Sequence, residues 1–300
     1  MRQLVELEFF ALFAQTLEFD QRHLYSDTLI DITNSAFVSS VIEIMTINDT
    51  LDEVRHSLPN IFPAHVDDFC LRKISLGFYP DVLREELFTL FPALSHVTGE
   101  INITNPTTIF ILTRDKEGKW IFGLQKSAQD GKYLEHKNKP QNFSSAISSH
   151  FACTFVSSLK QAGPKLLDAC CGTGTVLLEA CHAGLTPTGL DTSYQSRNMS
   201  RINIAHYGYT AEVLKEDAAL HQGQYDSAVI DFPYGSCCPR DIENEKAIIR
   251  NLADKVKQAI FITADEQKPL FLEEGYTVAW SVIMKFKKLD RYIYYVYGRK

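Results

Sequence analysis

An acid, an apolar residue, a proline and a tyrosine stand together at Asp231-Phe232-Pro233-Tyr234, directly after an apolar run that predicts a buried strand over 227–230. A carboxylate can accept one N–H bond of an amine conjugated to an aromatic ring, and the carbonyl of residue 232 or 233 can accept the other. Proline fixes φ and so holds that carbonyl in place. A tyrosine ring can stack on a flat base, which stabilises the complex by about 1–3 kcal/mol. These four residues predict a catalytic site that orients an exocyclic amine.

A glycine turn lies earlier in the chain, where residues 166–175 are typical of a strand that ends near Asp168 and runs into a helix. Gly172 and Gly174 allow a tight turn and a close approach of the backbone to a ligand. The positive end of a helix that begins near Thr175 favours a carboxylate. Dinucleotide-binding proteins have a third glycine at the position where this chain has Leu177. The Gly-Lys-Ser/Thr sequence of a phosphate-binding loop is also missing after the turn. S-adenosylmethionine, which has a carboxylate and no phosphate, fits this turn, and the two motifs together predict methyl transfer to nitrogen.

Two further acids follow the next two predicted strands. Asp191 is placed to accept hydrogen bonds from ribose hydroxyls, as the acid about 20 residues after a glycine turn commonly does. Asp217 could accept one from the adenine amino group. Either residue could instead cap a helix. Because the acids follow successive strands, we favour a cofactor site formed by Asp168, Cys170, Gly172, Thr173, Gly174, Asp191 and Asp217.

The elements that must position these residues alternate regularly. We expect strands over 165–169, 188–190, 211–215, 227–230, 259–263, 276–286 and 292–297, and helices over 175–183, 193–206 and 245–258. Strands that alternate with helices imply parallel βαβ units. The link between the last two strands is too short for a parallel crossover, so they must form an antiparallel hairpin. The prediction is an α/β, Rossmann-like fold with a mostly parallel seven-stranded sheet, the methyltransferase variant of the doubly wound fold.

The N-terminal part predicts an α+β domain. We expect helices over 5–17, 51–58 and 80–90, and strands over 29–32, 37–47, 108–113 and 120–124. Residues 131–141 are polar and lysine-rich, which is typical of a linker, and a helix over 143–159 follows them. We therefore expect an N-terminal domain at 1–137 and a methyltransferase domain at 138–300.

Composition limits the other function classes. The net charge is −7, and it is uneven, because residues 1–137 carry 12 Lys and Arg against 20 Asp and Glu, a net of −8. The C-terminal end is basic, and Lys285, Lys288 and Arg291 are candidate substrate contacts, although a solubilising strand edge would look the same. The seven cysteines show no metal-ligand spacing, so we expect no metal, reduced thiols and a cytoplasmic location. No apolar run is long enough to span a bilayer, and no secretory signal is present.

Residues 139–300 resemble the THUMP-associated RNA methyltransferases, which make N2-methylguanosine in tRNA. The run 167–180 is similar to that family's cofactor motif, D-x-x-C-G-[ST]-G-[ST]-[IVL]-L-[IL]-E-A, and 231–235 is similar to its D-P-P-Y-G. Residues 72–110 look like the closing strands of the RNA-binding THUMP module. The chain departs from the family in having Phe232 in place of the first proline, and its N-terminal part is poor in arginine.

The resemblance implies S-adenosylmethionine as cofactor, tRNA as partner and the N2 amine of a guanosine as the target. Two alternatives remain. One is methylation of a protein glutamine or of DNA adenine, against which Asp231 (in place of asparagine) and the lack of a separate basic domain argue. The other is a non-catalytic module that binds S-adenosylmethionine or RNA.

Overall fold

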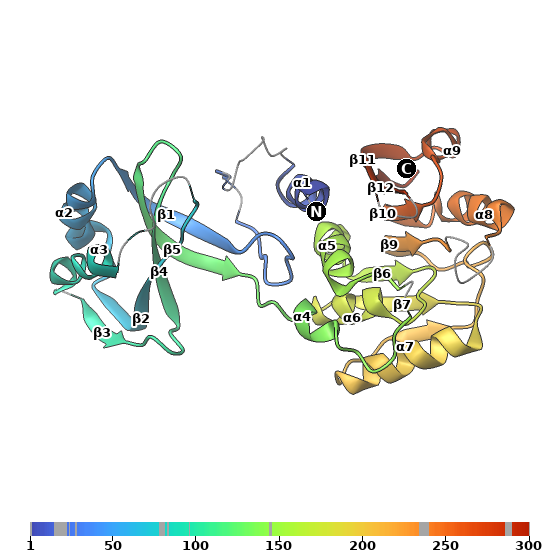
Figure 1. Cartoon of the computed structure of the whole chain (residues 1–300), viewed down its shortest axis with the longest axis horizontal. Coiled ribbons are helices and arrows are strands. Elements are labelled where there is room, and N and C mark those ends of the chain that lie inside the picture. Colours follow the sequence, from blue (N-terminus) through green and yellow to red (C-terminus); the bar gives the residue numbers. More distant parts are fainter. Residues whose placement is uncertain are drawn as a thin grey trace. The chain divides into compact units, whose positions relative to one another are not determined.

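The computed structural model describes residues 2–14, 23, 25–27, 29–77, 82, 84–95, 97–143, 146–233, 240–285 and 290–299. The chain forms two compact units, which are coloured along the sequence in Figure 1. The larger unit contains Met1–Thr16, Thr33–Phe37 and Gln129–Lys300, and the smaller unit contains Leu17–Ile32 and Val38–Ala128. The larger unit is therefore formed by three separate segments of the chain, whereas we expected a single domain boundary after residue 137.

The larger unit is built on a seven-stranded sheet. Its strands are β6 (Lys165–Asp168), β7 (Thr186–Leu190), β8 (Glu212–Leu214), β9 (Tyr225–Asp231), β10 (Val256–Thr263), β11 (Thr277–Met284) and β12 (Arg291–Tyr297). They lie in the order β11-β12-β10-β9-β6-β7-β8. β12 runs antiparallel to both β10 and β11, and the pairs from β10 to β8 are parallel. The predicted Rossmann-like methyltransferase fold with its C-terminal hairpin is confirmed.

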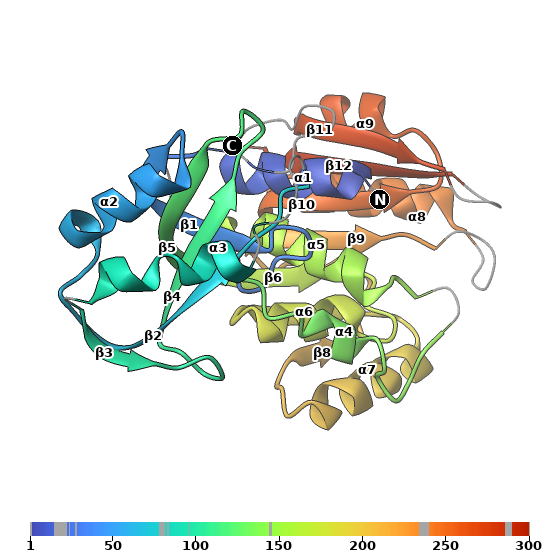
Figure 2. The ribbon, with the colours of Figure 1, turned by 60° about the vertical axis from the view of Figure 1, so that its left-hand side comes forward.

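Helices cover both faces of this sheet. α1 (Arg2–Phe13), α5 (Ser149–Leu159) and α6 (Thr175–His182) lie on one side in Figure 1, and α8 (Ile242–Leu252) and α9 (Lys268–Glu273) lie on the other. Figure 2 shows the strands of this sheet side by side, from β11 and β12 at one edge to β8 at the other. Alternate residues of each strand face opposite sides, so Leu166 and Val229 pack with α5, whereas Leu167 and Ala228 pack with α8. Burial on both faces explains why these strands are almost entirely apolar.

Two expectations about this unit were wrong. The helix expected over 245–258 ends at Leu252, because Val256 pairs with Tyr225 and begins β10. α9 was not expected at all. The helix expected over 143–159 begins at Ser149, where Ser148 caps it by accepting a hydrogen bond from the Phe151 N–H at 3.4 Å.

The first helix belongs to the larger unit because of a buried acid. Glu8 is 0% exposed. Its carboxylate accepts hydrogen bonds from the Ser35 hydroxyl at 2.8 Å and from the Ala36 and Phe37 N–H groups at 2.9 Å each. The Ser157 hydroxyl of α5 is a fourth donor. Burial raises the pKa of Glu8, and these donors oppose that rise. One side chain thus joins α1, the segment Thr33–Phe37 and α5.

The smaller unit is an α+β fold. Its sheet contains β1 (Ser40–Asn48), β2 (His65–Lys73), β3 (Thr98–Ile101), β4 (Thr108–Arg114) and β5 (Trp120–Ala128), in the order β1-β5-β4-β2-β3. α2 (Leu51–Ile61), α3 (Arg84–Phe88) and a 3-10 turn over Phe91–Leu94 accompany the sheet. Leu58, Phe62, Phe110 and Phe122 form the core. The strand expected over 29–32 does not form, although Ile30 and Ile32 are buried. Of the helix expected over 80–90, the described residues form α3, and residues 80, 81 and 83 lie outside the described residues.

Candidate active site

Three of the predicted acids meet at the carboxyl edge of the large sheet. Asp168 is the last residue of β6, and Asp231 is the last residue of β9. The two strands are parallel neighbours, with Asp168 in register with Val229. Asp191 follows β7, which borders β6 on its other side. Doubly wound sheets bind their ligands at this edge, so the predicted cofactor and catalytic residues share one place.

Burial perturbs the protonation of these acids. Asp168 is 3% exposed, and burial raises its pKa well above the ordinary range, with the Asp231 and Asp191 carboxylates adding to the rise. Burial raises the pKa of Asp231 to about 7, which the Arg291 guanidinium opposes. Burial also raises the pKa of Asp191. A cation held among these acids would favour their ionised forms, and S-adenosylmethionine carries both a sulfonium and an ammonium group.

The glycine turn is fixed from two sides. The Asp191 carboxylate accepts the Gly172 N–H at 3.0 Å and the Ser193 N–H at 2.8 Å, so it joins the turn to the start of α7 (Tyr194–His206). Gly174 adopts the left-handed region with φ 77°, and an added Cβ would come within 2.4 Å of the Ser200 hydroxyl. A larger residue there would have to adopt a left-handed backbone and displace the Ser200 side chain, so this position favours glycine.

Several buried oxygens around the turn have no hydrogen-bond partner among the described residues. They are Oγ1 of Thr173, Oγ1 of Thr175 and Oδ1 of Asp231. A buried polar atom without a partner costs about 1–3 kcal/mol, so their number at one sheet edge indicates a polar ligand. A ligand with a carboxylate, an ammonium group and ribose hydroxyls supplies the matching donors and acceptors. The predicted set therefore fits S-adenosylmethionine.

Two other predicted cofactor residues lie beside this group. The Asp217 carboxylate accepts the Ala219 N–H at 2.9 Å, which leaves its second oxygen available to a ligand. Cys170 is partly exposed, and burial followed by the Asp168 carboxylate raises the pKa of its thiol, so it stays neutral. A neutral thiol is a packing surface, and we assign it no nucleophilic role.

The predicted catalytic residues 231–233 differ in their burial and in the groups that they can offer to a substrate. The Phe232 side chain is 1% exposed, and its ring stacks on Phe261 with the ring centroids 6.3 Å apart. Its N–H donates to the Ile262 carbonyl at 3.1 Å. Only the carbonyl of this residue can therefore serve a substrate. Pro233 is partly exposed, and Tyr234 lies outside the described residues.

The predicted basic contacts differ from one another. Arg291 begins β12 and lowers the pKa of Asp231, so its charge reaches the site. Lys285 is exposed just beyond the end of β11, and it makes no interaction with the described residues of the site. Lys288 lies outside the described residues.

Sequence reasoning missed the polar inner face of α7. Arg197, Ser200 and Asn203 are all buried there. The Asn203 amide donates to the carbonyl of Thr173 in the glycine turn at 2.9 Å. Arg197 lies over the Tyr194 ring at 5.7 Å and favours the ionised form of Asp191. Polar residues at a spacing of three on a predicted helix were the available signal.

Residues 137–268 match the family model described as RMKL-like, methyltransferase domain. The larger unit carries an S-adenosylmethionine-dependent methyltransferase domain. The chain is 34% identical over 97 residues to a tRNA (guanine(10)-N2)-dimethyltransferase of Methanothermobacter thermautotrophicus, which covers 31% of this chain and 29% of the relative. It is 35% identical over 68 residues to a ubiquinone biosynthesis O-methyltransferase of Escherichia coli, which covers 21% and 28%. The chain thus spans less than a third of the length of these curated relatives.

A solved structure similar to this chain is that of a putative RNA methyltransferase from Pyrococcus horikoshii. The two share 15% sequence identity with a TM-score of 0.47, over 57% of this chain and 98% of that chain. Because this score is low, the likeness carries no argument here. Within the described ranges, no helix is long and apolar enough to cross a membrane. In the same residues, no three or more His, Cys, Asp or Glu side chains are placed so that they could hold a metal ion together.

Proposed function

We propose that this protein transfers a methyl group from S-adenosylmethionine to the exocyclic N2 amine of a guanosine in tRNA. The observation that carries the proposal is the state of Asp231. Its Oδ1 is buried and accepts no hydrogen bond from the described residues, at a strand end beside Asp168. The curated relative that modifies a tRNA guanine supports the choice of amine and RNA.

The chain's own residues would orient the amine. Its lone pair is delocalised into the ring, so both N–H bonds must be held before the lone pair can point at an electrophile. The Asp231 carboxylate accepts one N–H and the Phe232 carbonyl accepts the other. The buried Phe232 ring and its N–H bond to Ile262 fix this carbonyl, which takes over the task of the proline found in the family. Preorganised acceptors of this kind supply a large part of catalysis.

Bound S-adenosylmethionine supplies an electrophilic methyl group on its sulfonium. An amine nitrogen that received this methyl group would become acidic and would have to lose one proton. With a pKa of about 7, Asp231 can accept that proton and release it to water. A strong base is not required, because the proton leaves a cationic nitrogen.

The test is transfer of tritiated methyl from S-adenosylmethionine to bulk tRNA, followed by mass spectrometry of the nucleosides. We expect label in N2-methylguanosine, and we expect Asp231→Ala to abolish transfer while S-adenosylhomocysteine still binds. Asp226→Asn is the matched control. It lies near the other end of the same strand and should keep activity. Label that resists RNase but not protease would refute an RNA substrate, and full activity of Asp231→Ala would refute the role of Asp231.

We further propose that the smaller unit is a THUMP-like module that binds the RNA. The α+β class of this unit and the resemblance of residues 72–110 support this role. Phosphate contacts dominate nucleic-acid affinity, so Arg72→Glu on β2 should weaken tRNA binding and reduce its salt dependence without changing cofactor affinity. Unchanged tRNA binding by this variant would contradict a role for β2. A cytoplasmic location is part of the proposal, and the free thiols of Cys70, Cys153, Cys170, Cys171 and Cys181 are consistent with it.

A further inference from the structure

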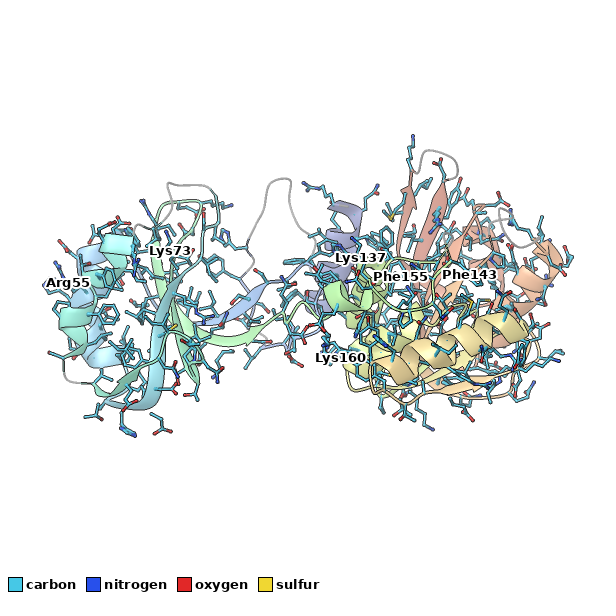
Figure 3. All side chains as sticks on the ribbon, turned by 60° about the horizontal axis from the view of Figure 1, so that its bottom comes forward. Arg55, Lys73, Lys137, Phe143, Phe155 and Lys160 are labelled. Atoms are coloured by element: carbon cyan, nitrogen blue, oxygen red, sulfur yellow. The ribbon has the colours of Figure 1, made fainter. Side chains whose placement is uncertain are left out.

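The segment that joins the two units is held against the larger unit by side chains along its length. We call residues 129–143 the strap. It contains the short helix α4 (Tyr133–His136). Asp130 of the strap contacts the His182 imidazole at 2.7 Å, and the Tyr207 hydroxyl donates to the Glu135 carbonyl at 2.8 Å. Of the two strap residues labelled in Figure 3, Phe143 is partly buried, whereas Lys137 is exposed. The sequence predicted a linker over 131–141, and in the structure these residues belong to the larger unit.

A buried pair anchors the strap to α6. His136 Nδ1 lies 3.0 Å from Oε1 of Glu179, and the two side chains are 0% and 2% exposed. Glu179 lies on α6, the helix that begins directly after the glycine turn. Lys139, the next buried residue of the strap, is 7% exposed, and burial lowers the pKa of its ammonium group. The strap is therefore anchored to the methyltransferase domain by buried polar side chains.

The far end of the strap meets the glycine turn through one side chain. Asn203 of α7 is 0% exposed. Its Nδ2 donates to the Gln141 carbonyl at 2.8 Å and to the Thr173 carbonyl at 2.9 Å, and its Oδ1 accepts the Gln141 N–H at 2.8 Å. Both donors and the acceptor of the amide are thus in use. A single amide joins the strap to the backbone of the turn.

We propose that Asn203 is a positioning residue for the cofactor loop, and that through Asn203 the loop and the strap order each other. Thr173 lies between Gly172 and Gly174, so the direction of its carbonyl sets the path of the turn. A ligand that fixes the turn must then also slow the opening of the strap at Gln141, because coupling between two sites is reciprocal. The inference rests on the cofactor site and does not depend on which amine is methylated.

Asn203→Asp tests the coupling with the least change of shape. The carboxylate still accepts the Gln141 N–H but cannot donate to the two carbonyls, which it repels. We expect calorimetry to show S-adenosylhomocysteine binding about tenfold weaker or worse, as the loss of buried hydrogen bonds predicts. The matched control is Tyr207→Phe, which removes another bond of the strap but no contact to the turn. It should lower the unfolding midpoint and leave this affinity within about twofold, which separates positioning from general stability.

Hydrogen exchange on the unaltered protein gives an independent test that cannot fail through misfolding. We expect S-adenosylhomocysteine to slow amide exchange in peptides that cover 139–143 as well as in those that cover the glycine turn. Protection of the turn alone would overturn the proposal. Equal loss of affinity in the Asn203→Asp and Tyr207→Phe proteins would overturn it too. Neither assay uses RNA, so an error in the proposed substrate leaves both results interpretable.

Discussion

Asp231→Asn should make the free protein more stable at neutral and alkaline pH. Burial raises the pKa of Asp231 from 3.8 to about 7. Between these two values the folded protein holds a proton that the unfolded chain has released, so this carboxyl group destabilises the fold as pH rises through that window. About three pKa units at about 1.4 kcal/mol each give an upper value of about 4 kcal/mol, reached at about pH 7 and above. Because Asp231 retains some contact with water, we expect about half of this value.

Urea unfolding at pH 4, 6 and 8 without ligand measures the effect. The variant and the natural protein should have similar midpoints at pH 4, and the variant should be more stable by about 2 kcal/mol at pH 8 with the same m-value. Asp226→Asn is a control of opposite sign, because the Lys257 side chain and the Lys165 N–H hold the pKa of Asp226 below its usual range. That variant should lose stability at pH 8 and approach the natural protein as pH falls below about 4. An Asp231→Asn protein that is no more stable than the natural one at pH 8 would refute the reasoning.

Three further predictions concern the same edge of the sheet. The kcat/KM for S-adenosylmethionine should rise with pH through about 7, because it reports the ionisation of Asp231 in the free protein, and initial rates at low S-adenosylmethionine concentration and several pH values check this; a flat profile would contradict its role as an ionised acceptor. Gly174→Ala should abolish binding of S-adenosylhomocysteine in calorimetry, because its Cβ would come within 2.4 Å of a buried hydroxyl. Gly184→Ala, at φ 76° with no atom within 4 Å of its Cβ, is the control and should only lower the free energy of unfolding by about 1 kcal/mol. If the Gly174→Ala and Gly184→Ala proteins lost binding equally, backbone strain and not the contact with Ser200 would be the cause. Phe232→Ala should lower the free energy of unfolding by about 3–5 kcal/mol in denaturant titration, and a loss below about 1 kcal/mol would mean that the ring is not a core anchor.

The sequence was informative where one periodic pattern dominated. Short apolar runs predicted β6 and β9, and the glycine turn between β6 and α6 could be placed because only glycine suits its backbone. The end of α8 could not be placed, because residues 248–262 are apolar at spacings that suit a helix and a strand alike. The pairing of Val256 with Tyr225 decides that boundary, and such a long-range contact leaves no local pattern.

The strap shows a second limit. Its lysines and polar residues are typical of an exposed linker, yet His136 and Lys139 are buried. Their burial depends on partners far along the chain, such as Glu179, which pairs with His136 at 3.0 Å. Composition reports the polarity of a segment, and it cannot report whether a matching polar surface exists elsewhere in the fold.

The alternation of β9 accounts for the tolerance of phenylalanine at position 232. Ala228, Ile230 and Phe232 face the side of the sheet that α8 covers, whereas Val229 and Asp231 face the other side. A large apolar ring at position 232 therefore adds to the core on the face of the sheet opposite Asp231. The same strand end thus supplies a buried ring on one face and, on the other, a carboxylate whose Oδ1 has no hydrogen-bond partner among the described residues. In the function proposed above, the packed Phe232 side chain and its N–H bond to Ile262 would hold the acceptor carbonyl in place of a fixed φ.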